Sequence, residues 1–246
     1  MFTKRLIQAA ASLALALTAT LSTPAQTANK RAKSSDHATS ASVRVREPLD
    51  LAVLVQDDLV SRVGSELEIT RDFISNLPAG SRVMVGYLTA GSLQVRQPFT
   101  DDLSRAAAAL RIPAASESAA PFNPYSEVIE ALKKFDSSDK NRNVVLLVSD
   151  GLDVSRGFDS ASSLNSVDLQ RAVREAKSRR VAVYSFYAPT VGLTSRDTLA
   201  VSYGQSSLAQ LSDETGGRAF FQGLSYVTFD AYFERLGRAL NGTAAY

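Results

Sequence analysis

Two short stretches of the chain are apolar at every position, and each leads into aspartate. Residues 51–55 lead into Asp57, and residues 144–148 lead into Asp150. A strand that is apolar on both faces is typical of the middle of a parallel sheet covered by helices on both sides. We therefore predict that both stretches are central strands on adjacent positions. Their carboxyl ends would then bring Asp57 and Asp150 to one rim, where open α/β sheets bind their ligands.

Strand-length and helix-length segments alternate along the rest of the chain. Further strands are predicted at residues 82–88, 93–99, 180–187 and 219–221, and helices at residues 63–77, 102–110, 128–135, 167–179, 207–215 and 227–240. Residues 188–204 have no clear period and are predicted to be a long connection. Alternating strands and helices imply right-handed βαβ units with helices on both sheet faces. Because Pro98 suits an edge, we predict a mostly parallel, six-stranded α/β sheet with one antiparallel edge strand.

The N-terminal residues have the pattern of an export signal. Lys4 and Arg5 precede an Ala/Leu-rich stretch, and small residues follow near Ala25. This apolar stretch is shorter than the roughly 20 residues that span a bilayer, so a cleaved signal is favoured over an uncleaved anchor. We expect residues 1–25 to be a signal peptide, residues 26–46 a flexible leader and residues 47–246 one domain. The protein is then predicted to be secreted or periplasmic.

Charge and composition exclude several classes of function. The chain has 27 basic and 25 acidic side chains, and removal of Lys4 and Arg5 with the signal leaves it neutral. This balance gives no reason to expect nucleic acid as a partner, or stable membrane insertion after signal cleavage. Cysteine is absent, and the only histidine, His37, lies in the predicted leader. A zinc site built from protein side chains and a Ser-His-Asp triad are therefore not expected.

Three segments together resemble the von Willebrand factor A domain, in particular exported bacterial proteins related to it. They are residues 51–58, residues 145–151 and residues 207–218, the last a predicted helix that ends in Glu-Thr-Gly-Gly before an aromatic strand. The resemblance extends over about residues 49–240. It implies a three-layer, Rossmann-like fold and a non-enzymatic module that binds a protein or envelope partner through the strand-end face.

The resemblance also implies a divalent-cation site, usually for magnesium, at the carboxyl ends of the central strands. The implied ligands are Asp57, Ser61, Asn123 and Asp150. The match is partial, because Leu59 replaces a hydroxyl ligand and Asn123 replaces a threonine, and Ser126 is an alternative oxygen donor. Two interpretations stay open: a weakened magnesium site in which water replaces the missing hydroxyl, or a relic that holds no metal.

A binding module is the predicted function, and two alternatives remain. The loops expected around the contact are residues 57–64, 114–125, 151–165 and 188–204. A metal-dependent hydrolase would use Asp57, Asp58 and Asp150. The sequence shows no nucleophile paired with a base, no Gly-rich phosphate loop and no basic clamp for such chemistry. The other alternative is a metal-free structural component of an envelope assembly.

Overall fold

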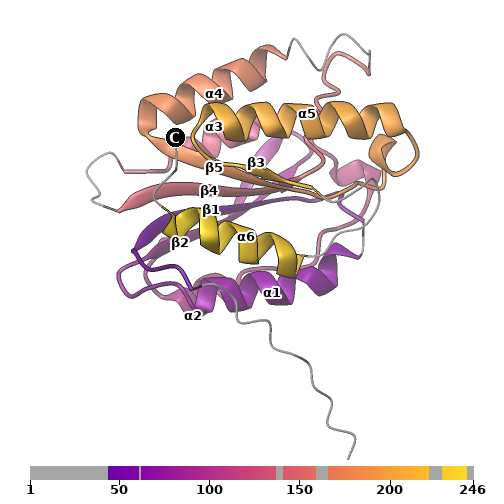
Figure 1. Ribbon diagram of the computed structural model, residues 1–246. Coiled ribbons are helices and arrows are strands. Elements are labelled where there is room, and N and C mark those ends of the chain that lie inside the picture. The colour runs from indigo at the N-terminus through magenta and orange to yellow at the C-terminus, as the bar shows by residue number, and fades with distance from the viewer. Residues whose placement is uncertain (1–43, 61, 137–140, 159–165, 222–228, 243–246) are drawn as a thin grey trace, which may run out of the picture. The chain divides into compact units, whose positions relative to one another are not determined.

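The computed structural model describes residues 44–60, 62–136, 141–158, 166–221 and 229–242. Within these ranges the chain forms one sheet between two layers of helices (Figure 1). The predicted signal peptide and nearly all of the predicted leader lie outside the described residues. None of the helices in the described ranges is long and apolar enough to cross a membrane.

The sheet has six strands among the described residues, in the order β3-β2-β1-β4-β5-β6. They are β1 (Leu49–Gln56), β2 (Arg82–Thr89), β3 (Ser92–Thr100), β4 (Arg142–Ser149), β5 (Val181–Tyr187) and β6 (Ala219–Phe220). Neighbouring strands are parallel except for β2 and β3, which form an antiparallel pair at one edge. The predicted sheet is therefore confirmed, including its single antiparallel edge strand.

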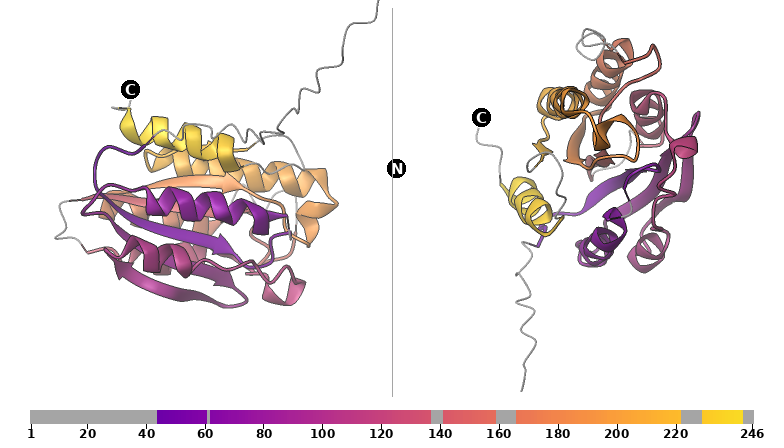
Figure 2. Two further views of the ribbon diagram at one scale, coloured as in Figure 1. Left: turned by 90° about the horizontal axis from the view of Figure 1, so that it is seen from below. Right: turned by 90° about the vertical axis from the view of Figure 1, so that its right-hand side faces the viewer.

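Helices cover both faces of the sheet (Figures 1 and 2). One face carries α1 (Val63–Ser75), α2 (Leu103–Ala108) and α6 (Phe229–Asn241), and the other carries α3 (Pro124–Leu132), α4 (Val167–Arg179) and α5 (Thr198–Glu214). Successive side chains of β1 enter opposite cores, since Val53 packs in the core with α1 and Leu54 in the core with α3. Burial on both faces explains why residues 51–55 are apolar throughout.

Helix α5 is longer than the sequence predicts. It begins at Thr198 and not near residue 207, so the prediction of a long irregular connection over residues 188–204 is wrong at its end. The side chain of Asp197 caps the helix by accepting hydrogen bonds from the backbone N–H groups of Leu199 and Ala200 at 2.8 and 3.2 Å. Gly204 lies inside the first half of α5, and glycine disfavours helix by about 1 kcal/mol relative to alanine. Because of this glycine, helix propensity does not predict the first part of α5.

Glu127 of α3 is a buried carboxyl at the end of β2. Its Oε2 accepts a hydrogen bond of 2.9 Å from the backbone N–H of Thr89. Burial is the main cause that raises the pKa of Glu127 to about 8, and the nearby charge of Glu130 acts in the same direction. The unfolded chain releases this proton near the ordinary pKa of 4.5. The folded state then holds a proton that the unfolded chain has lost, so the free energy of unfolding falls as the pH rises from about 5 to 8.

Glu127→Gln is expected to remove this part of the pH dependence, because the amide keeps an acceptor for Thr89 and carries no charge. Between about pH 5 and pH 8, the free energy of unfolding of the parent should fall by on the order of 2–4 kcal/mol more than that of the variant. Urea unfolding at both pH values measures the difference. Glu130→Gln, an exposed change on the same helix, is the matched control and should keep most of the parent's pH dependence, because burial, the main cause of the raised pKa of Glu127, is unchanged. Equal pH dependence in the parent and in Glu127→Gln would contradict the prediction.

Candidate functional site

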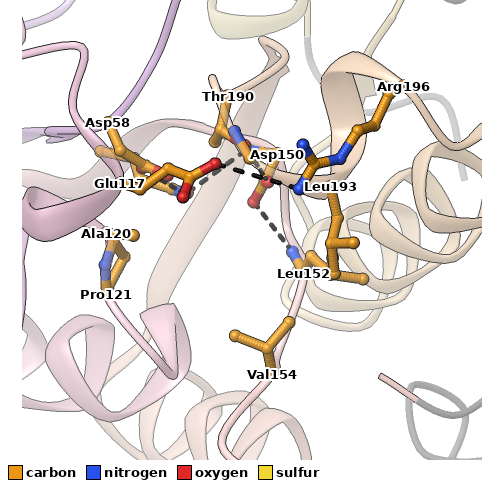
Figure 3. A pocket seen from close by; sticks show the side chains of 12 residues that line it. Asp58, Glu117, Ala120, Pro121, Asp150, Leu152, Val154, Thr190, Leu193 and Arg196 are labelled. Carbon is orange, nitrogen blue, oxygen red and sulfur yellow. Dashed lines mark hydrogen bonds and ion pairs between the residues drawn. The ribbon is translucent and has the colours of Figure 1, made fainter. Parts of the chain in front are cut away.

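The strand-end rim of the sheet lies where β1 and β4 end side by side. Val55 stands opposite Val148 in the parallel register, so the chain leaves both strands at the same edge, as predicted. A cavity of about 210 Å³ opens at this rim (Figure 3). It is walled by the end of β1, residues 117–121, the segment that follows β4 and residues 190–196. Residues far apart in the sequence therefore meet around one hollow.

Asp150 lines this cavity and is held by hydrogen bonds. Its side chain is almost fully buried, and its Oδ2 accepts hydrogen bonds from the hydroxyls of Thr190 and Thr194 at 3.1 and 3.0 Å. Its Oδ1 accepts a third hydrogen bond, of 3.1 Å, from the backbone N–H of Leu152. Burial raises the pKa of Asp150, and these hydrogen bonds act in the opposite direction. Both threonines come from the segment after β5, which lies within residues 188–204, one of the loops predicted to surround the contact.

Asp58 is the second carboxylate that lines the cavity. Its Oδ1 accepts a hydrogen bond of 2.9 Å from the side-chain amide of Gln56. The Gln56 carbonyl oxygen in turn accepts a hydrogen bond of 2.5 Å from the hydroxyl of Ser149, which ties the ends of β1 and β4 together. Burial, and next the charge of Asp150, raise the pKa of Asp58 to about 7. Asp58, two residues after the end of β1, is not among the predicted metal ligands and has a predicted catalytic role only in the hydrolase alternative.

Asp57 does not line the cavity and is instead paired with Arg111, which follows α2. The guanidinium donates two hydrogen bonds to the carboxylate, Nη1 to Oδ1 at 2.6 Å and Nη2 to Oδ2 at 2.8 Å. The backbone N–H of Ala114 donates a third, of 3.0 Å, to Oδ1. Burial alone would raise the pKa of Asp57, but the hydrogen bonds from Arg111 and Ala114 and the guanidinium charge outweigh it and lower the pKa. Asp57 is therefore ionised, and the positive charge of Arg111 already balances its negative charge.

Asn123 serves as the N-cap of α3. Its Oδ1 accepts hydrogen bonds from the backbone N–H groups of Tyr125 and Ser126 at 3.1 and 3.4 Å. Its Nδ2 donates a hydrogen bond of 2.7 Å to Asp168 of α4. The hydroxyl of Ser126, the alternative oxygen donor, donates to the backbone carbonyl of Asn123 at 2.8 Å. Both oxygens predicted to be available to a cation therefore have roles in the local structure.

The predicted set of metal ligands is only partly described. Ser61 lies outside the described residues. Asp57, Asn123 and Asp150 each satisfy other protein groups, and Leu59 is fully buried in the core. Within the described ranges, there is no group of three or more His, Cys, Asp or Glu side chains that could hold a metal ion. The described residues do not fit the predicted magnesium site as they are arranged, and the site stays a prediction.

Backbone packing between α5 and the turn after β4 fixes the position of Asp150. A Cβ atom on Gly204 would lie 2.0 Å from the carbonyl oxygen of Asp150, so only glycine fits there. Gly151 has a φ of +71°, and a Cβ atom on it would lie 2.5 Å from the carbonyl oxygen of Gly204. The hydroxyl of Tyr125 donates a hydrogen bond of 2.6 Å to the carbonyl of Gly151. The close packing at the two glycines and the hydrogen bond from Tyr125 therefore hold the turn that carries Asp150 in place.

Comparison with known proteins identifies the fold. No family model matches the sequence, and no curated protein matches it either. Among solved structures, the chain is similar to the conserved hypothetical protein BatB from Bacteroides thetaiotaomicron, with a TM-score of 0.54, 8% identity and coverage of 78% of this chain and 97% of that one. It is also similar to the human COPII-coat protein Sec24c, with a TM-score of 0.52, 11% identity and coverage of 80% of this chain and 33% of that one.

The SpRpn10 VWA domain also matches, with a TM-score of 0.47, 11% identity and coverage of 80% of this chain and 100% of that one, a likeness too low to support an argument. At such identities the other two matches concern the fold alone. Together with the strand order and the single antiparallel strand, they confirm the predicted von Willebrand factor A-like fold. The described part of the chain therefore has a fold of the von Willebrand factor A type.

Proposed function

We propose that the domain is an exported, non-enzymatic binding module whose strand-end face contacts a protein partner. The observation that carries this proposal is the cavity of about 210 Å³ at the ends of β1 and β4. Open α/β sheets bind their ligands at this edge, and the surrounding loops can vary without disturbing the core. The secreted or periplasmic location is part of the proposal and is supported by the pattern of residues 1–25.

The charges around the cavity favour a partner segment that presents a basic side chain. Asp58, Asp150 and Glu117 line the cavity, and Arg196 is the one basic residue among the described residues that line it. Asp58 and Asp150 are buried, whereas Glu117 lies at the exposed rim. A lysine or arginine side chain of a partner would complement this lining, and such complementarity speeds association and selects among partners.

The hydrolase alternative is not favoured by any specific feature of the described residues. It requires Asp57, Asp58 and Asp150 to act together, but the carboxylate of Asp57 is paired with Arg111 and does not line the cavity. The metal-free structural role has no specific feature in its favour either, whereas the cavity supports binding.

Ala120→Trp is the variant that tests this function, because it adds a large side chain to the wall of the cavity. The parent domain, immobilised, is expected to retain a protein from an envelope extract of the producing cells, and titration calorimetry with that purified protein gives the affinity. Binding should fall about tenfold or more in Ala120→Trp, a loss of about 1.4 kcal/mol. Glu117→Lys should also weaken binding, because it reverses the charge at the rim.

Lys134→Trp is the matched control, since Lys134 is an exposed residue just after α3, at the end of that helix away from the cavity. It should bind the partner as the parent does. Equal affinity of the parent and Ala120→Trp for the retained protein would contradict the proposal. Such a result would place the contact on another face of the domain.

A further inference from the structure

We propose that Arg111 takes the place that a divalent cation holds in the family that the sequence resembles, so that the strand-end face is built to work without metal. The guanidinium is a permanent positive charge that belongs to the chain. It is set against Asp57, the first aspartate of the implied metal motif. This inference concerns the charge balance of the face and does not depend on the identity of a partner.

The first support is the way in which the Asp57 carboxylate is saturated. Oδ1 accepts hydrogen bonds from Arg111 and from the backbone N–H of Ala114, and Oδ2 accepts a second hydrogen bond from Arg111. A carboxylate offers about four acceptor positions, and three of them are filled here. The planar fork of arginine matches a carboxylate in this two-point geometry and does not lose its charge at any physiological pH. A metal ion at Asp57 would have to displace these donors.

The second support is that Arg111 is itself held in place before any ligand arrives. Its guanidinium carbon lies 4.1 Å from the centre of the ring of Tyr87, a fully buried residue of β2. The Tyr87 hydroxyl donates a hydrogen bond of 2.6 Å to the carbonyl of Arg111 and accepts one of 2.7 Å from its N–H. The aromatic face and the two hydrogen bonds fix both the backbone and the charged end. Arg111 is therefore ordered in the position that neutralises Asp57.

The third support is that the backbone after Arg111 closes over Asp57. The N–H of Ala115 donates a hydrogen bond of 3.1 Å to the carbonyl of Asp57, and the N–H of Asp57 donates one of 2.9 Å to the carbonyl of Leu88. Only 5% of Asp57 is exposed to solvent. Access of a hydrated magnesium ion would require this segment to open, and magnesium loses its water reluctantly.

The fourth support is the loss of the neighbouring oxygen ligands. Leu59 stands where the family has a hydroxyl ligand, and its side chain is fully buried in the core on the α1 side of the sheet. Asn123, the implied replacement for the threonine ligand, uses its Oδ1 to cap α3. The residues at these positions and the pairing of Asp57 therefore support the same conclusion. The positive charge at this face comes from the Arg111 side chain and not from a bound metal ion.

Magnesium titration of the mature protein, residues 26–246, is the test. For the parent we expect no heat of binding at millimolar magnesium and no change in melting temperature. Arg111→Gln frees the Asp57 carboxylate, and water can fill the coordination positions that Leu59 and Asn123 do not supply. This variant should therefore show a magnesium-dependent rise in melting temperature of about 2–4 °C once the ion exceeds its dissociation constant several-fold. Arg196→Gln removes a more exposed arginine near the same cavity and should behave as the parent does.

Two results would overturn the inference. One is magnesium uptake by the parent that Asp57→Asn abolishes. The other is a folded Arg111→Gln protein that shows no response to magnesium, which would make the pair an ordinary structural contact. If Arg111→Gln does not fold, magnesium titration of the parent and of Asp57→Asn still tests whether a metal ion binds at Asp57. The function proposed above is tested separately, because partner capture is compared among variants and not with and without metal.

Discussion

Gly204→Ala is expected to lower the free energy of unfolding by about 3 kcal/mol or more. The new methyl group would lie 2.0 Å from the carbonyl oxygen of Asp150, which is backbone and cannot rotate away. Overpacking of a well-packed interior costs about 1–3 kcal/mol, and contact with fixed backbone belongs at the upper end of that range or beyond. The gain in helix propensity, about 1 kcal/mol, is too small to offset it. Urea unfolding of the variant measures the loss.

Gly64→Ala is the matched control, because Gly64 also lies in the first half of a helix, α1. Its new methyl group would lie 3.2 Å from the Cγ2 of Ile112, a side chain that is 61% exposed and free to move. We expect the free energy of unfolding of this variant to equal that of the parent or to be higher by up to about 1 kcal/mol. If both substitutions changed the stability by the same amount, close packing of α5 against the Asp150 turn would not be the cause.

Arg111→Ala is expected to destabilise the domain by about 3 kcal/mol. It leaves the carboxylate of Asp57 buried without its counter-charge, and removal of one partner from a buried ion pair typically costs about 3–5 kcal/mol. We take the lower end because the Arg111 side chain remains 32% exposed. Chemical denaturation at neutral pH measures the change. Addition of Asp57→Asn to this variant should recover part of the loss, since the isolated charge is then removed.

Arg196→Ala provides the comparison for this loss. Arg196 lies 3.9 Å from Glu117, and both side chains are 67% exposed. Such surface pairs contribute about 0–1 kcal/mol, because water screens the charges. A loss in Arg111→Ala no greater than the loss in Arg196→Ala would show that Asp57 gains little from its partner.

The fold could be predicted well because the hydrophobic pattern specifies it directly. Residues 51–55 and 144–148 are apolar at every position, and the structure buries both on two faces at the centre of the sheet. The boundaries of α4, Val167–Arg179, agree with the predicted helix, because an apolar stripe and a charged outer face alternate clearly there. These signals are local and periodic, so they can be read from the chain without any knowledge of tertiary contacts.

The site could be predicted only in part, because its decisive contacts are not local. Arg111 is 54 positions from Asp57, and no spacing in the sequence marks the two as partners. The sequence also cannot decide which of Asp57 and Asp58 enters the cavity. Both lie in the turn that follows β1, where the regular alternation of a strand no longer decides which side a side chain faces. The position of the rim could therefore be predicted from the sequence. That Asp58 lines the cavity while Asp57 pairs with Arg111 could not.

The central claim is that an internal arginine, and not a metal ion, neutralises Asp57 at the strand-end face. A crystal structure grown in millimolar manganese, with anomalous scattering recorded from the metal, tests it most directly. The account predicts that Arg111 still donates two hydrogen bonds to Asp57 and that no anomalous peak lies beside that carboxylate. A manganese peak within coordination distance of Asp57 and Asp150, with the guanidinium displaced, would contradict it.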